Sequence, residues 1–377
     1  MSNRALDHLG TMPVAQFMRR HWQRRPLLVR KAIADVAPPV DARGLFALAG
    51  RDDVEARLVT SFDGWRLQHG PIPARRIPPR SKRGWTLLVQ GVDLHDDRAA
   101  ALLERFRFIA DARLDDLMIS YASDGGGVGP HIDAYDVFLL QVQGQRRWRI
   151  GTGDPRDLVP GLPLKVLRRF KASDEWVLDP GDLLYLPPGV AHEGTALGAD
   201  CMTCSIGFRA PEWRDLSDPW QETLLDRGSQ DGRYADPGTP PATHPARLSP
   251  HFVDATFAAL TRHRPTRTDA RDMLLAFLTE PKPRTVFSRP RRALSAAALR
   301  SAAHARGLRL DRRTRMLYAG KALAINGELL SPAPEDRLLM ELLADRRSLT
   351  ARDAGKLRAS SWTLLAEWQA AGWLHVD

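Results

Sequence analysis

Short apolar runs separated by glycine and proline dominate residues 1–210 of the chain. Three of these runs, Leu117–Tyr121, Val137–Val142 and Gln145–Ile150, have the length and the residue types of strands, and Gly144 offers a turn between the last two. Trp176–Leu178 and Asp182–Leu186 read as two further strands. Short strands with turn residues between them are typical of an antiparallel barrel, which we therefore expect over residues 1–210.

The pattern changes at Pro211, where helical periodicity replaces the strands. From about residue 284, helices mix with a small hairpin, which resembles a winged helix. The elements that we predict are helices over Trp213–Arg227 and His251–Leu278 with a polar connection over Gly228–Pro250, a helix over Ala296–Arg306, strands over Arg315–Tyr318 and Ala322–Ile325 on either side of Gly320, and helices over Glu335–Leu343 and Leu357–Ala371. The predicted class is α+β, with domains over residues 1–210, 211–283 and 284–377.

Two residues that commonly bind metals, His131 and Asp133, stand two positions apart where the glycine-rich loop Gly125–Pro130 enters a strand pair. Positions i and i+2 of a strand share a face, so both side chains can reach one ion. His192 follows the turn Pro187–Gly189 at the end of a later strand. The motif H-x-D alone recurs by chance, but two imidazoles and one carboxylate form the facial triad of non-heme Fe(II) oxygenases. That triad leaves three coordination positions open for a co-substrate and O₂.

Arg146 lies on the apolar face of the run Gln145–Ile150, because Arg146, Trp148 and Ile150 alternate with Arg147 and Arg149. A buried guanidinium needs an anionic partner. A dicarboxylate co-substrate would supply one, and arginine can bind a carboxylate through two hydrogen bonds. The alternatives are pairing with a protein carboxylate, or a face assignment that is wrong by one residue.

Together these residues resemble a JmjC-type 2-oxoglutarate oxygenase built on a cupin barrel. The segment Gly125–Phe138, with Gln145–Arg149, is similar to the bacterial ribosomal oxygenases. The resemblance runs from about residue 10 to the C-terminus and is strongest over residues 117–210. Further similar stretches are Phe17–Trp22, Arg25–Arg30, Trp85–Val92, Arg233–Pro237 and Leu278–Lys282.

The resemblance implies a double-stranded β-helix (the cupin or JmjC barrel), a helical dimerisation region over residues 211–283 and a winged-helix-like C-terminal domain. It implies Fe(II) on His131, Asp133 and His192, 2-oxoglutarate on Arg146, and O₂ as a second co-substrate. The bacterial family hydroxylates an arginine of large-subunit ribosomal protein L-sixteen. Arginine 3-hydroxylation of a ribosomal protein by a homodimeric enzyme is therefore the expected activity.

One position departs from the family pattern. The family places a hydroxyl beside the arginine that holds 2-oxoglutarate, and the corresponding residue here is Ala122. Ser120, on the same strand face, is the cofactor-binding residue that we expect instead. Thr203 and Ser205, on a later strand, are the alternatives.

The cationic target calls for an acidic or aromatic pocket near the metal. Asp124, Tyr135 and Asp136 flank the ligand loop, and we expect them to bind the substrate. Ordinary turn chemistry explains the two aspartates equally well.

Composition and charge agree with this interpretation. A chain of 377 residues, 43% of them hydrophobic, can form two or three domains with real cores. The absence of a signal-like or membrane-length apolar run, together with only two cysteines, predicts a cytoplasmic protein without membrane contact. The net charge of +10 and the basic run Arg75–Arg83 make contact with ribosomal RNA a further expectation. General solubility accounts for the same charge equally well.

Two other classes of function share these features. The same triad would serve a 2-oxoglutarate oxygenase that acts on a histidyl residue, a methylated lysine or a nucleic-acid base. A non-catalytic cupin scaffold that binds nucleic acid or a partner is the alternative outside the enzymes. Because a scaffold has no need of three metal ligands and Arg146 together, the sequence favours the oxygenase.

Overall fold

The structure is a computed structural model that describes residues 5–228, 248–261 and 264–377. The chain forms two compact units. The first contains Met1–Ala210, Lys282–Arg289 and Asp311–Arg313, and the second contains Pro211–Pro281, Pro290–Leu310 and Thr314–Asp377. The similar stretch Arg233–Pro237 and most of the connection predicted over Gly228–Pro250 lie outside the described residues.

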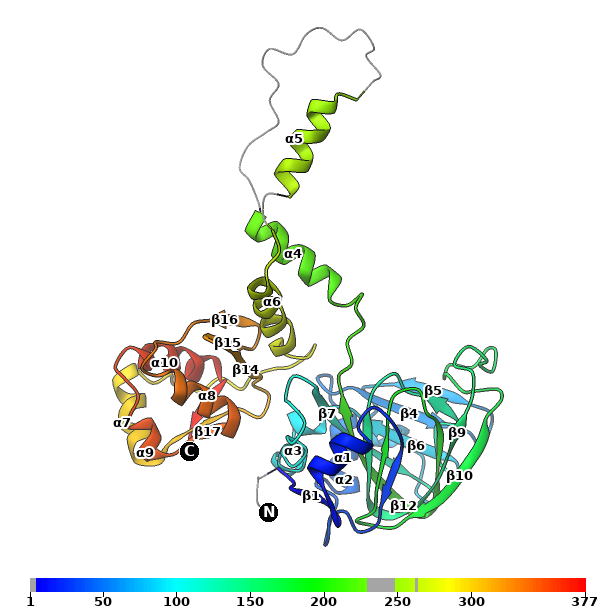
Figure 1. The fold of residues 1–377 in the computed structure, drawn as a ribbon. Helices are drawn as coiled ribbons and strands as arrows, with labels where there is room; N and C mark the ends of the chain where they lie inside the picture. The colour runs from blue at the N-terminus through cyan, green and yellow to red at the C-terminus, as the bar shows by residue number, and fades with distance from the viewer. Residues whose placement is uncertain (1–4, 229–247, 262–263) are drawn as a thin grey trace. The chain divides into compact units, whose positions relative to one another are not determined.

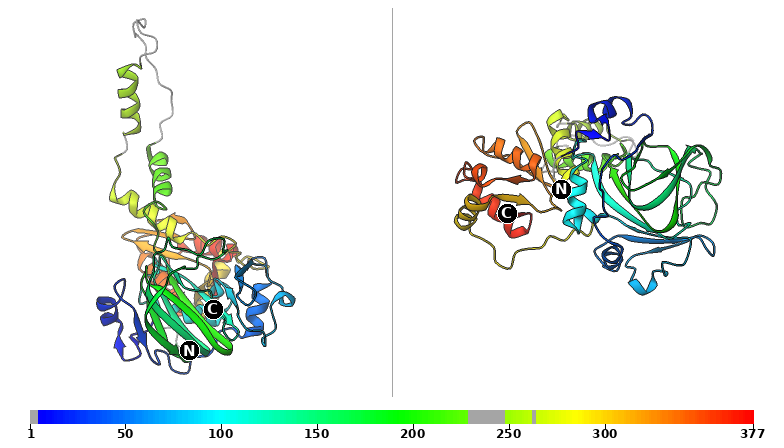
Figure 2. Two further views of the ribbon diagram at one scale, coloured as in Figure 1. Left: turned by 90° about the vertical axis from the view of Figure 1, so that its right-hand side faces the viewer. Right: turned by 90° about the horizontal axis from the view of Figure 1, so that it is seen from below.

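Within the described part of the first unit, ten strands form one antiparallel sheet that curls round on itself, as expected for a cupin barrel (Figures 1 and 2). Neighbouring strands follow the order β3-β11-β9-β12-β7-β6-β4-β5, while β10 pairs with β9 and β8 pairs with β12. The strands are β3 Leu27–Val29, β4 Ala56–Thr60, β5 Arg66–His69, β6 Trp85–Val89, β7 Leu114–Ala122, β8 His131–Ile132, β9 Val137–Thr152, β10 Lys171–Leu178, β11 Leu183–Leu186 and β12 Ala191–Phe208.

Short elements cover one face of this sheet, where the largest core cluster packs around Phe17, Trp85, Tyr121 and Phe138. A second cluster, which includes Trp148, lies on the other face, on the side of the metal ligands. The short elements are β1 His8–Leu9, β2 Met12–Pro13, α1 Val14–Arg20, α2 Ala42–Ala49, the 3₁₀ helices η1 Ala74–Arg76 and η2 Val92–Leu94, and α3 Asp97–Glu104.

The prediction of a turn at Gly144 is wrong, because β9 continues through this residue as one strand of 16 residues. The pairing with β12 goes from Thr203↔Gln141 to Met202↔Gln143, so β9 has one extra residue, Val142, just before Gly144, whose φ is +64°. This is a β-bulge, which re-aims the side chains that follow it. The bulge explains why odd positions such as Leu139 line the pocket before Gly144, whereas even positions such as Arg146 line it afterwards.

The second unit contains two three-stranded sheets and helices around a core that includes Leu299, Leu343, Trp362 and Trp368. The helix–hairpin–helix order predicted for the C-terminal part is confirmed. The elements are α4 Ser217–Gly228, α5 Pro250–Leu260, α6 Arg267–Thr279, α7 Ala296–Arg306, β13 Leu308–Leu310, β14 Met316–Ala319, β15 Ala322–Ile325, β16 Glu328–Leu330, α8 Arg337–Arg346, β17 Ser348–Leu349, α9 Ala351–Ala354, α10 Ser361–Ala371 and β18 Leu374–Val376.

The single helix predicted over His251–Leu278 is two helices, α5 and α6. Thr266 forms a capping box with Asp269, since each side chain accepts from the other's backbone N–H, and this starts a new helix directly after Pro265. A search of the described residues finds no helix with both the length and the apolar character needed to cross a membrane.

Candidate metal centre and its pocket

Strand pairing brings the three predicted metal ligands together. His131 in β8 lies opposite His192 in β12, with ring centroids 4.2 Å apart, and Asp133 follows one residue after β8. The backbone N–H of Gly189 donates to the carbonyl oxygen of Asp133 at 2.9 Å, which ties the Pro-Pro-Gly turn to the H-x-D segment. One ligand atom from each of the three side chains lies within 4.8 Å of the other two, so the set can surround one ion.

Backbone carbonyls fix the orientation of both imidazoles. Nδ1 of His131 lies 3.0 Å from the Gly129 carbonyl oxygen, and Nδ1 of His192 lies 3.0 Å from the Val190 carbonyl oxygen. Each contact places the proton on Nδ1 and leaves Nε2 as the lone-pair donor. The two Nε2 atoms lie 3.9 and 3.6 Å from Oδ2 of Asp133. Burial, followed by the neighbouring His131, lowers the pKa of His192 to about 4, so this ring is neutral at pH 7 and able to bind a metal.

Arg146 is buried without a carboxylate partner among the described residues. Its side chain is inward-facing as predicted, with 5% of the residue exposed, and its Nη1 donates to Ser120 Oγ at 3.0 Å and to Thr203 Oγ1 at 3.3 Å. Its Nε has no hydrogen-bond partner. Burial lowers its pKa, which reflects the cost of an uncompensated charge. An anion is therefore the missing partner.

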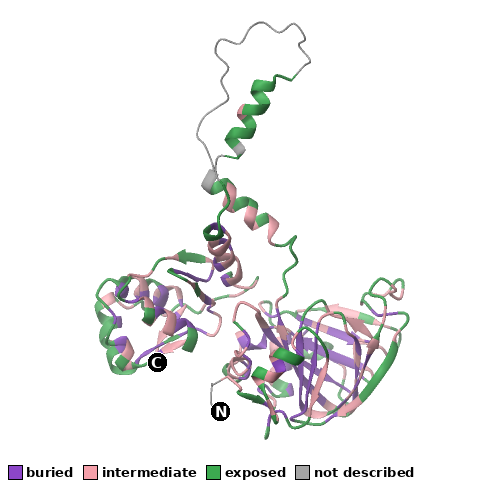
Figure 3. Cartoon of the chain, viewed as in Figure 1, coloured by how far each residue is buried: buried purple, intermediate pink, exposed green. Residues whose placement is uncertain are grey.

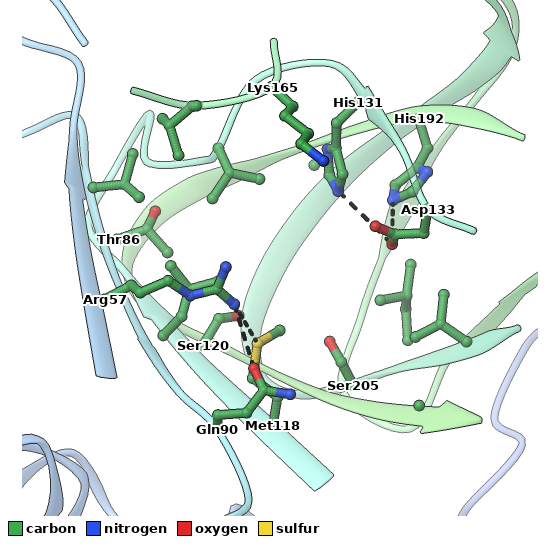
Figure 4. Close-up of a pocket in the computed structure, with 18 of the residues that line it drawn as sticks. Arg57, Thr86, Gln90, Met118, Ser120, His131, Asp133, Lys165, His192 and Ser205 are labelled. Atoms are coloured by element: carbon green, nitrogen blue, oxygen red, sulfur yellow. Dashed lines mark hydrogen bonds and ion pairs between the residues drawn. The ribbon is translucent and has the colours of Figure 1, made fainter. Parts of the chain in front are cut away.

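A cavity of about 520 Å³ joins the metal ligands to Arg146 (Figure 4). In the close-up, Ser120 and Ser205 lie on the side away from the three ligands, and the Lys165 side chain points toward His131. Arg57, Gln90 and Met118 line a further part of the wall, where Arg57 donates to the Gln90 side-chain oxygen at 3.3 Å. The carboxylates in the wall besides Asp133 are Asp115 and Asp116.

Comparison with known proteins matches two parts of the chain, a JmjC domain over residues 101–216 and a ROXA-like winged helix over residues 260–375. The ribosomal oxygenase YcfD from Escherichia coli has a similar structure, with a TM-score of 0.82 and 32% sequence identity over 99% of this chain and 100% of that one. The chain belongs to the ribosomal oxygenase family. This confirms the predicted class, a JmjC-type cupin domain followed by a winged helix.

Other relatives of this ribosomal oxygenase agree. Ribosomal protein uL16 3-hydroxylase from Escherichia coli (strain K12) is 39% identical over 251 residues, which span 66% of each chain. The probable ribosomal oxygenase of Haemophilus influenzae is 36% identical over 208 residues, which span 54% of this chain and 51% of that one. The alignments thus cover about two thirds or less of these curated relatives. YcfD in complex with cobalt and 2-oxoglutarate matches with a TM-score of 0.83 and 32% identity over 98% of this chain and 99% of that one.

Two of the three residues that we expected to bind substrate lie outside the pocket wall of this ribosomal oxygenase. Asp136 is fully buried away from the pocket, where Tyr185 donates to its Oδ1 at 2.6 Å and Gln23 and Arg113 donate to its Oδ2. Asp124 also lies outside the pocket wall. Its Oδ1 accepts from the backbone N–H of Gly198 at 2.9 Å and its Oδ2 pairs with Arg83 at 3.1 Å, so it stabilises a turn. Asp124 thus has the turn role that was the alternative explanation, whereas Asp136 belongs to a buried network of residues distant in the sequence.

Tyr135, the third expected contact, does line the pocket and is 43% exposed. The residues that the sequence analysis missed are Asp115 and Asp116. A signal for Asp116 was present, because alternate residues of a strand share a face and Ser120, Met118 and Asp116 all line the same pocket. Extending the face of Ser120 backwards by four residues would have found it.

Proposed function

We propose that this ribosomal oxygenase is an Fe(II)- and 2-oxoglutarate-dependent dioxygenase that hydroxylates the β-carbon of an arginine in ribosomal protein uL16, a protein arginine 3-hydroxylase. One observation carries the proposal: His131, Asp133 and His192 share a pocket with Arg146, a buried cation that pairs with no carboxylate in the part of the chain that the structure describes. The uL16 3-hydroxylase of Escherichia coli and the cobalt and 2-oxoglutarate complex of YcfD support it.

Nε2 of His131, Nε2 of His192 and Oδ2 of Asp133 would hold Fe(II). Arg146 would bind the distal carboxylate of 2-oxoglutarate, with Ser120 and Thr203 fixing the guanidinium by accepting from its Nη1. Thr203 donates in turn to the side-chain oxygen of Gln141 at 2.9 Å, which keeps its lone pairs directed at Arg146. With 2-oxoglutarate and O₂, bound Fe(II) supplies the oxidising power for hydroxylation of an unactivated C–H bond.

The acidic wall gives the pocket its preference for a cation. Asp116 is 2% exposed, and its Oδ2 accepts from Gln90 Nε2 at 2.8 Å and from the backbone N–H of Gly91 at 2.9 Å. Its Oδ1 accepts no hydrogen bond from the described residues. A guanidinium at Oδ1, beside the Tyr135 ring, would gain a charge-assisted bond and hold the arginine side chain in the cavity that leads to the metal ligands.

The test uses a peptide that spans the uL16 arginine. We expect a gain of one oxygen, about 16 Da in intact mass, that requires Fe(II), 2-oxoglutarate and O₂ together. A lysine in place of the target arginine should lose most of the activity, because a point charge does not match a planar fork. Asp116→Asn should weaken peptide use, whereas Asp124→Asn, a matched aspartate outside the pocket, should not. Oxidation of a histidyl peptide or an RNA instead would overturn the arginine assignment and leave the oxygenase assignment standing.

We also infer a homodimer through residues 211–283. Large apolar side chains in this region are exposed, with Trp213 88%, Leu225 65% and Phe257 68% accessible, and α5 is coloured almost entirely as exposed (Figure 3). An apolar surface of this kind calls for a partner, and a second copy of the same helices offers a self-complementary one. An interface of at least about 1,200 Å² is the size expected of a stable dimer.

Contact with ribosomal RNA is a further part of the proposal. In the run Arg75–Arg83, Arg75 and Arg76 are exposed and could meet phosphates, in keeping with the net charge of +10. A steep loss of affinity for a ribosomal RNA fragment with rising salt, reduced by Arg75→Ala with Arg76→Ala, would support it. Equal binding by that variant would count against it. The reaction would then take place in the cytoplasm, where ribosomes are assembled.

A further inference from the structure

Lys282 contacts the acidic pair of the pocket wall from behind. Its Nζ lies 2.9 Å from Asp115 Oδ1 and 3.3 Å from Asp116 Oδ2. Both aspartates line the cavity, but Lys282 does not, and its side chain is only 22% exposed. The residue follows α6 in the chain, yet Lys282–Arg289 is part of the same compact unit as the barrel. Lys282 therefore reaches the carboxylates from the side opposite to the one that substrate would approach.

The two oxygens of Asp116 differ in their surroundings. Oδ2 receives Lys282 Nζ in addition to the Gln90 side chain and the Gly91 N–H, which makes three donors on one oxygen. Oδ1 receives no hydrogen bond from the described residues. It lies near Gly207, which lines the cavity, since a Cβ at that glycine would stand 3.6 Å from Oδ1. The carboxylate is thus anchored through one oxygen and presents the other to the pocket.

Lys282 also compensates a concentration of negative charge. Asp93 is 5% exposed and Asp116 2%, and Asp115 adjoins them. Burial raises the pKa of Asp116, and Lys282 is the largest influence that lowers it. Among the described residues, this group is also near Arg209, which contacts Asp115 at 3.4 Å, and Arg57 in the pocket wall. Without a cation behind it, a carboxylate as buried as Asp116 would take up a proton more readily.

We propose that Lys282 is a positioning residue for the cationic substrate: it compensates the negative charge of the Asp115–Asp116 pair and holds Asp116 so that its free oxygen faces the pocket. This inference rests on the proposed function, because it concerns the same arginine site. The segment after α6 would then take part in substrate selection, although the residues proposed to touch the substrate belong to the barrel.

The test compares Lys282→Met with Lys282→Arg and with Lys356→Met, an exposed lysine that pairs with Asp353 at 3.0 Å and serves as the matched control. At pH 7, Lys282→Met should raise the peptide KM on the order of tenfold or more, with the 2-oxoglutarate KM changed by less than about twofold. The Kd of the peptide, measured with Mn(II) in place of Fe(II) and without turnover, should rise in parallel. Lys282→Arg should restore most of the affinity, and Lys356→Met should behave as the wild type.

The pH profile separates positioning from a merely structural role. Raising the pH from 7 to about 8.5 should shrink the deficit of Lys282→Met, because Asp116 then loses its proton without help from the lysine. A wild-type peptide KM and Kd in Lys282→Met would overturn the inference. So would a deficit that is independent of pH, that Lys282→Arg fails to rescue, or that extends equally to 2-oxoglutarate. An inactive wild type with every candidate peptide would instead refute the proposed function.

A comparison of Asp115→Asn with the double variant Asp115→Asn/Lys282→Met keeps the test valid if Lys282→Met alone does not fold. Removing Asp115's charge removes the like-charge repulsion that Lys282 offsets. In the Asp115→Asn background, Lys282→Met should therefore weaken peptide binding by less than about threefold. The same tenfold cost in this background would contradict a role for Lys282 in compensating the charge of the acidic pair.

Discussion

Replacing Arg146 by methionine separates two effects that the structure sets against each other. The guanidinium is buried, its Nη1 donates to Ser120 and Thr203, its Nε has no partner, and no carboxylate among the described residues pairs with it. For the protein alone, Arg146→Met removes a buried charge that nothing compensates. For the complex with 2-oxoglutarate, the same change removes the group that binds a carboxylate.

The two effects have different magnitudes. A hydrogen bond to a charged group contributes about 1.5–3 kcal/mol, and about 1.4 kcal/mol corresponds to a factor of ten. The KM and Kd for 2-oxoglutarate should therefore rise by about tenfold to about 150-fold. In the absence of ligand, the relief of the buried charge is partly offset because Ser120 loses its donor. The Tm of Arg146→Met should be unchanged or up to about 4 °C higher than that of the wild type.

Two measurements test this reasoning, succinate release as a function of 2-oxoglutarate concentration and thermal melting with and without 2-oxoglutarate and Mn(II). The control is Arg147→Met, which removes the same side chain from the opposite, partly exposed face of β9 and should change neither quantity by more than about twofold or about 1 °C. Normal 2-oxoglutarate binding by Arg146→Met would refute the assignment of the co-substrate carboxylate. A Tm lowered by several degrees without ligand would show that the charge is compensated in the free protein.

Three further predictions concern the metal, the assembly and the pH dependence of stability. His131→Ala or Asp133→Ala should abolish succinate production while the circular dichroism spectrum and Tm persist, and turnover by a verified variant would contradict the metal assignment. Light scattering should give a mass of about 84 kDa, twice the chain mass of 42.1 kDa. Phe257→Asp should shift the protein toward the monomer. A wild-type mass near that of one chain at all concentrations would exclude the dimer. Burial and then Asp116 raise the pKa of Asp93 to about 7, above its value in the unfolded chain, so its contribution to stability is complete below about pH 4 and is lost as the pH rises through 7. Asp93→Asn should therefore have a higher Tm than the wild type at pH 8, and most of this difference in Tm should disappear by pH 5. An equal difference in Tm at both pH values would speak against a buried, protonated Asp93.

The H-x-D pair and the inward-facing Arg146 could be predicted because each follows from residues close together in the sequence. The two-residue spacing of His131 and Asp133 and the alternation around Arg146 depend only on the geometry of a strand. The pairing of His192 with His131 could be inferred from the resemblance. The bulge at Gly144 could not be inferred from spacing alone, since a glycine with positive φ serves a turn and a bulge equally well.

The orientation of the loop aspartates depends on partners far away in the sequence. Asp136 stands three residues after a metal ligand, yet it points away from the pocket because Tyr185 and Gln23, 49 and 113 positions distant, bind both of its oxygens. Proximity to a motif therefore says little about the direction of a side chain. A buried carboxylate points toward whichever donors the fold supplies.

The same principle governs the site of the cationic substrate. Strand alternation from Ser120 leads back to Asp116, so sequence reasoning can find the carboxylate, but it cannot find the cation behind it. Lys282 lies 166 positions away (282 − 116), in the stretch Leu278–Lys282 that the family resemblance marked without giving it a role. Lys282, Gln90 and the Gly91 N–H all bind Oδ2 of Asp116. The orientation of this carboxylate, with Oδ1 toward the pocket, is therefore set by residues far from the H-x-D motif. On the proposed function, specificity for a cation in this pocket would thus depend on a tertiary contact, and a change in the segment after α6 would alter it without touching any residue that lines the cavity.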